Sequence, residues 1–140
     1  MPAAEWLSVG QVKMCRQSYE DCQKALELEL NNAAYYKCSL GNAGNQITEA
    51  MFDRLMEQEL EHAEIFATAL GVETPALVTR KCHEDDGKNL RLSNRHEAIA
   101  IKFYTEAANR APEPRIVQIF RALAEVENQH LVLTNTYLFR

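Results

Sequence analysis

The sequence predicts an all-α protein, a four-helix bundle in which two helical hairpins are joined by one long crossover. Three observations lead to this fold class. Long amphipathic stretches make up most of the chain, only five glycines and four prolines interrupt them, and one half of the sequence repeats in the other. A chain of 140 residues suffices for one domain with its own core, so we expect a single domain spanning residues 1–140.

The helix ends follow from capping and turn residues. The segment Ser8-Val9-Gly10-Gln11 has the form of a capping box, and the cluster at 41–44 (Gly-Asn-Ala-Gly) suits a helix end and a turn. Gly71 is expected to stop the next helix, and Pro112 and Pro114 to separate the last two, because proline is tolerated in a first turn. The expected elements are helices at about 8–42, 45–70, 88–110 and 113–139, with a crossover at 71–87. This order of short turn, long crossover and short turn is the layout of a ferritin-like bundle.

Composition and charge exclude several classes of function. The formal net charge is −5, which argues against a nucleic-acid or anionic-membrane partner, because phosphate binding requires clustered lysine and arginine. No apolar run approaches the roughly 18 residues of a membrane span. Residues 1–6 lack the basic start and the apolar stretch of a signal peptide, so we expect a cytoplasmic location.

The four cysteines are Cys15, Cys22, Cys38 and Cys82, and none forms a CxxC pair. Their spacing therefore offers neither a zinc ribbon nor a rubredoxin-type iron site. In a reducing cytosol we expect free thiols. Cys15 and Cys22 lie seven residues apart, on one helix face, which makes a redox role the alternative. We expect instead that they are small buried packing residues.

The most informative feature is an internal repeat with an offset of 68 residues. Each half contains a glutamate, a tyrosine seven residues later, and an ExxH motif whose glutamate lies 30 residues after the first. At a rise of about 1.5 Å per residue, a hairpin of this length returns the ExxH motif to the level of the first glutamate. The matched pairs are Glu29 and Glu97, Tyr36 and Tyr104, Phe52 and Phe120, Glu59 and Glu127, and His62 and His130.

The repeat predicts a dinuclear metal site. Positions i and i+3 share a helix face, so the carboxylate and the imidazole of each ExxH point the same way. Packing the hairpins about a pseudo-twofold axis then gathers four carboxylates and two imidazoles, the ligand set of di-iron and di-manganese carboxylate proteins. Two such units arise by chance with an expectation of about 10⁻³, which favours a metal site over a metal-free bundle with charged faces. The predicted ligands are Glu29, Glu59, His62, Glu97, Glu127 and His130.

Several other polar residues have plainer interpretations. His96 lies about 100° round the helix from Glu97 and is expected on the surface. The segment 82–85 (Cys-His-Glu-Asp) is expected to be a polar loop rather than a second metal site. Solvated positions are expected for Glu57, Glu61 and Glu64.

Carboxylates with a few imidazoles favour iron, manganese or zinc over copper, and only iron or manganese gives redox chemistry. We expect two iron ions that react with O₂ or H₂O₂ in a two-electron step, with manganese, a mixed pair or zinc as alternatives. Tyr36 and Tyr104 are candidate hydrogen-bond donors to ligand carboxylates, with core packing as the alternative. Asn32 is matched by Ala100 in the second half, and it would make the two metal positions inequivalent.

One motif of the second half consists of Glu97, Ala100 and Tyr104, followed by Phe120, Leu123, Ala124, Glu127 and His130, and it recurs more loosely in the first half. With this motif the sequence resembles the rubrerythrin branch of the ferritin-like superfamily over about residues 20–138. The resemblance implies a non-haem di-iron protein, often a peroxidase of H₂O₂ and often a homodimer. Rubrerythrins usually carry a rubredoxin domain with two CxxC pairs, whereas this chain ends ten residues after His130, so we expect a separate electron-donor protein.

One position departs from the family pattern. Rubrerythrins have an additional glutamate one turn before the first ligand glutamate of the second half, and this chain has Asn94 there. In the family, the movement of one iron during peroxide reduction depends on that carboxylate. The sequence thus predicts a di-iron oxidoreductase acting on H₂O₂ or O₂, with a ferroxidase that collects iron as the alternative.

Overall fold

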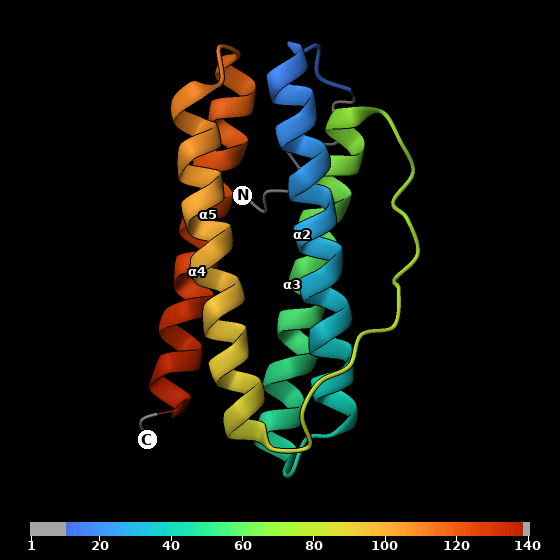
Figure 1. Cartoon of the computed structure of the whole chain (residues 1–140), viewed down its shortest axis with the longest axis vertical. Helices are drawn as coiled ribbons and strands as arrows, with labels where there is room; N and C mark the ends of the chain where they lie inside the picture. Colours follow the sequence, from blue (N-terminus) through green and yellow to red (C-terminus); the bar gives the residue numbers. More distant parts are fainter. Residues whose placement is uncertain (1–10, 139–140) are drawn as a thin grey trace.

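The computed structural model describes residues 11–138, and this part of the chain forms four α-helices without a β-strand. Helices α2 and α3 form one hairpin, α4 and α5 form the other, and the two hairpins stand side by side (Figure 1). A long crossover runs along the outside of the α2–α3 hairpin, from one end of the bundle to the other (Figure 1). The predicted fold class is therefore confirmed. The helices span Arg16–Gly41 (α2), Gln46–Leu70 (α3), Asp86–Arg110 (α4) and Pro114–Leu138 (α5).

Capping side chains fix where three of the helices begin. At the starts of α2, α3 and α4, the side chains of Cys15, Asn45 and Asp85 each accept a hydrogen bond from the backbone N–H three residues later. These bonds satisfy donors that the first turn of a helix leaves unpaired. Helix α3 ends at Leu70 and is capped by Gly71, whose φ of 74° lies in the left-handed region that glycine adopts without steric cost.

The first helix begins later than predicted. It starts at Arg16 rather than near residue 8, and residues 11–15 are not helical. This segment pairs with the end of α3 instead, where the N–H of Val12 donates to the carbonyl of Ala69 (3.1 Å). The predicted cap at Ser8 lies outside the described residues. The other helices begin and end within two residues of their predicted positions.

A layer of polar side chains divides the hydrophobic core into two clusters. The larger cluster contains the rings of Phe66, Tyr104 and Phe120, whose centroids lie 5.8, 5.5 and 5.7 Å apart. The smaller cluster lies at the other end of the bundle and includes Tyr36 and Phe52. Each helix therefore contributes apolar residues on both sides of the polar layer. As a result, the polar layer lies in the middle of the bundle rather than at either end.

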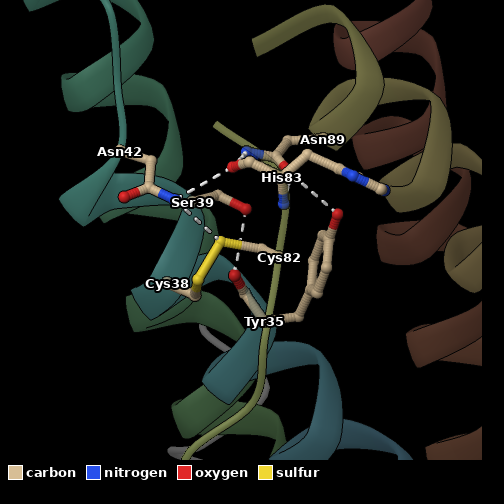
Figure 2. The surroundings of a disulfide bond; sticks show 7 residues. All are labelled: Tyr35, Cys38, Ser39, Asn42, Cys82, His83 and Asn89. Atoms are coloured by element: carbon tan, nitrogen blue, oxygen red, sulfur yellow. Dashed lines mark hydrogen bonds between the residues drawn. A yellow bond between two sulfur atoms is a disulfide. The ribbon is translucent and has the colours of Figure 1, made fainter. Parts of the chain in front are cut away.

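A disulfide bond joins Cys38 in α2 to Cys82 in the crossover, with a Cα–Cα distance of 5.9 Å (Figure 2). The expectation that all four cysteines are free thiols is therefore wrong. The two residues are 44 positions apart, and they meet because the crossover runs back alongside α2 (Figure 1). Spacing rules for local cysteine motifs do not detect a pair of this kind.

Hydrogen bonds hold the end of the crossover beside the disulfide (Figure 2). The side-chain amide of Asn89 in α4 accepts from the N–H of His83 and donates to its carbonyl, both at 2.9 Å. Tyr35 of α2 donates to the same Asn89 amide oxygen (2.9 Å), and Asn42 donates to the His83 carbonyl (2.9 Å). The segment 82–85 is thus a polar loop, as expected, and it is fastened to both α2 and α4.

The two remaining cysteines are free and differ in burial. Cys22 is fully buried, as expected. Cys15 is exposed, contrary to expectation, because it caps α2 from outside and does not share a helix face with Cys22. None of the helices in the described range is long and apolar enough to cross a membrane. The cytoplasmic location stays a prediction.

We expect Cys82→Ser to lower the free energy of unfolding of the oxidised protein by about 2–4 kcal/mol, because a crosslink between residues this far apart restricts the unfolded chain. Denaturant unfolding of wild type and variant in the presence of chelator measures the difference. Reduction of the wild type with dithiothreitol should produce the same loss. Cys15→Ser, which keeps a capping side chain, should produce none. Equal stability of oxidised and reduced wild type would contradict a stabilising crosslink.

Candidate metal centre

Six polar side chains of the repeat meet in one buried layer between the two hydrophobic clusters. Two glutamates come from α2 and α4, and the ExxH motifs come from α3 and α5. The four glutamates have no exposed surface, while His62 and His130 are 5% and 4% exposed. The structure thus brings together every residue predicted as a metal ligand, namely Glu29, Glu59, His62, Glu97, Glu127 and His130.

The six residues form two overlapping groups, and within each group the potential ligand atoms lie within 4.8 Å of one another. One group contains Glu29 and His62, the other contains Glu97 and His130, and the two ExxH glutamates belong to both. If two metal ions were bound, the ExxH glutamates would therefore be ligands of both. Each group takes three residues from one hairpin and its fourth residue from the other.

Both imidazole rings present Nδ1 to the carboxylates. His62 Nδ1 lies 3.1 Å from Oε1 of Glu127 and 3.5 Å from Oε2 of Glu29. His130 Nδ1 lies 3.1 Å from Oε1 of Glu59. The two rings are stacked, with centroids 6.0 Å apart and an interplanar angle of 14°. In each histidine, Nδ1 is therefore the nitrogen that could serve as a metal ligand.

The donor set fits a pair of divalent cations. One oxygen atom of each of the four glutamates is buried and has no hydrogen-bond partner within the described structure. A buried polar atom left in this way costs about 1–3 kcal/mol, and more when it is charged. Two divalent ions would neutralise the four carboxylates and bind the four oxygens that lack a hydrogen-bond partner. One uncharged imidazole would be a further ligand in each group.

Without a metal, the cluster reduces its charge by taking up protons. Burial and repulsion from neighbouring glutamates raise the pKa of Glu59 well above its ordinary value. Burial, together with the adjacent Glu127, raises the pKa of Glu97 to about 8. Burial opposes the charge on the imidazoles, but the surrounding carboxylates prevail and raise the pKa of His62 to about 10 and that of His130 to about 9. Near neutral pH, metal binding must therefore displace protons from these groups.

Each tyrosine of the repeat donates a hydrogen bond to a glutamate of the opposite hairpin. The Tyr36 hydroxyl donates to Oε1 of Glu97 (2.6 Å), and the Tyr104 hydroxyl donates to Oε1 of Glu29 (2.5 Å). Burial and the neighbouring carboxylates raise the pKa of both tyrosines well above the ordinary value, so both remain protonated donors. Their rings also belong to the hydrophobic clusters, so both interpretations considered for these residues apply.

Two polar contacts of the centre were not predicted, because they do not follow the repeat. Ser93 Oγ forms a hydrogen bond with the Tyr36 hydroxyl (2.5 Å), and Gln58 Oε1 accepts a hydrogen bond from Nε2 of His130. The other half has alanine and valine at the matching positions. Ser93 lies four residues before Glu97, on the same helix face, and that spacing is the signal that could have identified it.

The remaining candidates have mixed outcomes. Asn32 is buried, but no hydrogen bond within residues 11–138 joins it to a glutamate of the centre, so its expected effect stays a prediction. His96 is half-buried rather than on the surface, because its ring packs edge-on against Tyr35 of α2, with centroids 5.2 Å apart. The glutamates expected to be solvated are exposed, namely Glu57, Glu61 and Glu64.

Comparison with known proteins agrees with this geometry. The family model described as Rubrerythrin matches residues 22–133, a segment that contains all six residues of the layer and both tyrosines. No match was found among curated proteins or among solved structures. The family model covers well over half of the sequence, and the matched segment folds as two hairpins around a carboxylate and imidazole cluster. The chain therefore belongs to the rubrerythrin family.

Proposed function

We propose that this protein is a non-haem di-iron oxidoreductase that reacts with H₂O₂ or O₂. The observation that supports this function most directly is the pair of overlapping ligand groups, which share Glu59 and Glu127 and leave one partnerless oxygen on every glutamate. Oxygen donors with one imidazole for each ion suit iron or manganese. Membership of the rubrerythrin family favours iron.

A bound pair of iron ions would supply the electrons that reduce peroxide or O₂. The protein's own residues hold and orient the ligands. Tyr36 donates to Oε1 of Glu97 and Tyr104 donates to Oε1 of Glu29, and in both glutamates the partnerless atom is Oε2. Each tyrosine thus fixes one oxygen of its glutamate and leaves the other oxygen for an ion.

The surroundings of the layer control water and protons. The two hydrophobic clusters exclude bulk water, which strengthens electrostatic interactions within the layer. Ser93, Tyr36 and Glu97 form a continuous hydrogen-bonded chain. Because Tyr36 donates its own proton to Glu97, Ser93 must donate to the Tyr36 oxygen, and this chain holds the proton of Tyr36 on the carboxylate of Glu97.

Three further parts of the proposal rest on the family resemblance and on the sequence. The electrons would come from a separate donor protein, the chain would form a homodimer, and the protein would work in the cytoplasm. The ferroxidase alternative has no specific observation in its favour.

We expect two metal ions per chain after anaerobic loading with ferrous iron. Glu59→Ala should lose both ions, because this glutamate belongs to both ligand groups. Glu57→Ala, an exposed position two residues earlier on the same helix, should keep both. Elemental analysis of the desalted proteins measures the number of metal ions per chain. One ion or none in the wild type would contradict a dinuclear centre, and loss of a single ion in Glu59→Ala would contradict the bridging role.

Removal of the metal should lower the melting temperature, and the difference should grow as the pH rises from 5 to 8. The folded pKa values of His62 and His130, about 10 and about 9, exceed the ordinary value of 6.5. The metal-free protein therefore takes up protons on folding, and this stabilisation, complete below the ordinary value, is lost progressively as the pH rises toward the folded values.

The metal-loaded protein has already released these protons, so it should not lose stability in the same way. At a thousandfold excess over the dissociation constant, a bound ligand adds about 4 kcal/mol. Calorimetric melting with and without chelator at pH 5, 6.5 and 8 provides the comparison. Equal melting temperatures with and without chelator at pH 8, or a difference that shrinks as the pH rises, would contradict this link between metal binding and protonation.

Asn94 is expected to limit peroxide chemistry. It lies one turn before Glu97, and its side chain contacts Thr134 and Asn135 of α5 rather than a residue of the centre. A carboxylate at this position would neighbour Glu97 and favour Fe(III), because i and i+3 share a helix face. The wild type should therefore react with O₂ at a rate comparable to, or above, its rate with H₂O₂.

Asn94→Glu should shift the ratio of the two rates toward peroxide, whereas Asn94→Gln, which adds no charge, should leave it unchanged. Stopped-flow oxidation of the anaerobic diferrous protein by each oxidant, followed in the near-ultraviolet, measures both rates. A wild type that consumes peroxide orders of magnitude faster than O₂ would show that Asn94 has no such effect.

A further inference from the structure

The two halves of the centre differ in the residues that surround them. On the side of Glu97 and His130, Gln58 accepts a hydrogen bond from His130 Nε2. At the position related to Gln58 by the 68-residue offset, the other half has Val126. Within the described part of the chain, no side chain accepts a hydrogen bond from Nε2 of His62. The repeat therefore places similar ligands in two dissimilar environments.

The contact with Gln58 determines which nitrogen of His130 carries the proton. An amide oxygen has no proton to give, so Nε2 of the ring must be the donor. In the uncharged ring this leaves the lone pair on Nδ1, the atom that lies 3.1 Å from Glu59. An acceptor at the outer nitrogen also fixes the orientation of the ring and raises its basicity as a ligand.

A second contact acts on the same side. Ser93 forms a hydrogen bond with the Tyr36 hydroxyl, which donates to Glu97. On the other side Tyr104 donates to Glu29 without such support, because Ala25 stands where the second half has Ser93. Glu97 and His130 are therefore both oriented before an ion arrives, Glu97 by Tyr36 and His130 by Gln58. Ligands that are already oriented bind an ion at a smaller entropic cost.

We propose that Gln58 is a positioning residue that makes the two metal positions inequivalent, so that the position formed with Glu97 and His130 binds its ion more tightly and fills first. The inference rests on the proposed dinuclear centre and adds an order of loading to it. The effect expected from Asn32 concerns the side of Glu29 and stays a separate prediction, whereas the contacts of Ser93 and Gln58 lie on the side of Glu97 and His130. Loss of a contact of this kind typically weakens metal binding by about 10–100-fold.

Titration of the metal-free protein with Co²⁺, followed by calorimetry and visible absorption, tests the order of binding. The wild type should show two steps of different affinity. Gln58→Val should weaken the tighter step by about tenfold and leave the weaker step unchanged. Gln58→Glu keeps an acceptor and should retain the tight step. The matched variant on the other side, Val126→Gln, gives His62 an acceptor and should tighten the weaker step.

Proton NMR of the Co²⁺-loaded protein measures an effect that Gln58 would not have if it only stabilised the fold. Each metal-bound histidine gives a strongly shifted signal from its Nε2 proton, and this proton exchanges with water. In the wild type, the signal of His130 should exchange more slowly than that of His62, because Gln58 holds its proton. Gln58→Val should remove the slow exchange, and Val126→Gln should slow the exchange at His62.

Two Co²⁺ steps of equal affinity in the wild type would overturn the inference and leave the dinuclear centre intact. Equal weakening of both steps by Gln58→Val would have the same meaning. Failure of the wild type to bind Co²⁺ at all would instead overturn the centre itself. Gln58 and Val126 are both half-buried, so the metal-free variants should retain the helical content of the wild type by circular dichroism. If Gln58→Val does not fold, Val126→Gln decides the question alone.

Discussion

Four carboxylates buried side by side repel one another and lose their hydration, and the need to offset this cost explains most of what surrounds them. Two of the carboxylates accept a tyrosine hydroxyl, and both imidazoles turn Nδ1 toward the group. The carboxylate oxygens that remain without a hydrogen-bond partner are the atoms to which two divalent ions would bind. Until the ions bind, protons take their place, which is why the pKa values of His62 and His130 rise despite burial.

The cost of burying four carboxylates also connects the ligand layer to the stability of the bundle. A layer of charges adds little cohesion of its own, so the aromatic cluster around Phe66, Tyr104 and Phe120 supplies apolar burial on one side of it. The smaller cluster around Phe52 does so on the other side. Each ligand group takes its fourth residue from the opposite hairpin, and each tyrosine donates across the same boundary. A bound pair of ions would therefore also strengthen the docking of the two hairpins.

The sequence predicted correctly those parts of the structure that follow a regular spacing of residues. The helices, their order and the six residues of the layer follow from 3.6-residue patterning and from the 68-residue repeat, both of which act locally or by symmetry. The start of α2 was misplaced, because residues 11–15 are not helical and Val12 instead donates to the carbonyl of Ala69 at the end of α3. The partner of Cys38 was missed, because it depends on the path of the crossover. Gln58 was missed because it breaks the repeat, and the same break distinguishes the two halves of the centre.

The disulfide also changes what a protease could do to this protein. The crossover is the most exposed stretch of the described chain, and such segments are where proteolytic nicking concentrates. Because Cys38 precedes residues 72–81 and Cys82 follows them, a single cut within this stretch would leave two fragments still joined by the disulfide bond. Each fragment would keep one half of the repeat, with α2 and α3 on one and α4 and α5 on the other when the cut falls at 72–81. The nicked molecule would migrate as one species until it is reduced, and its buried carboxylates would stay paired across the bundle.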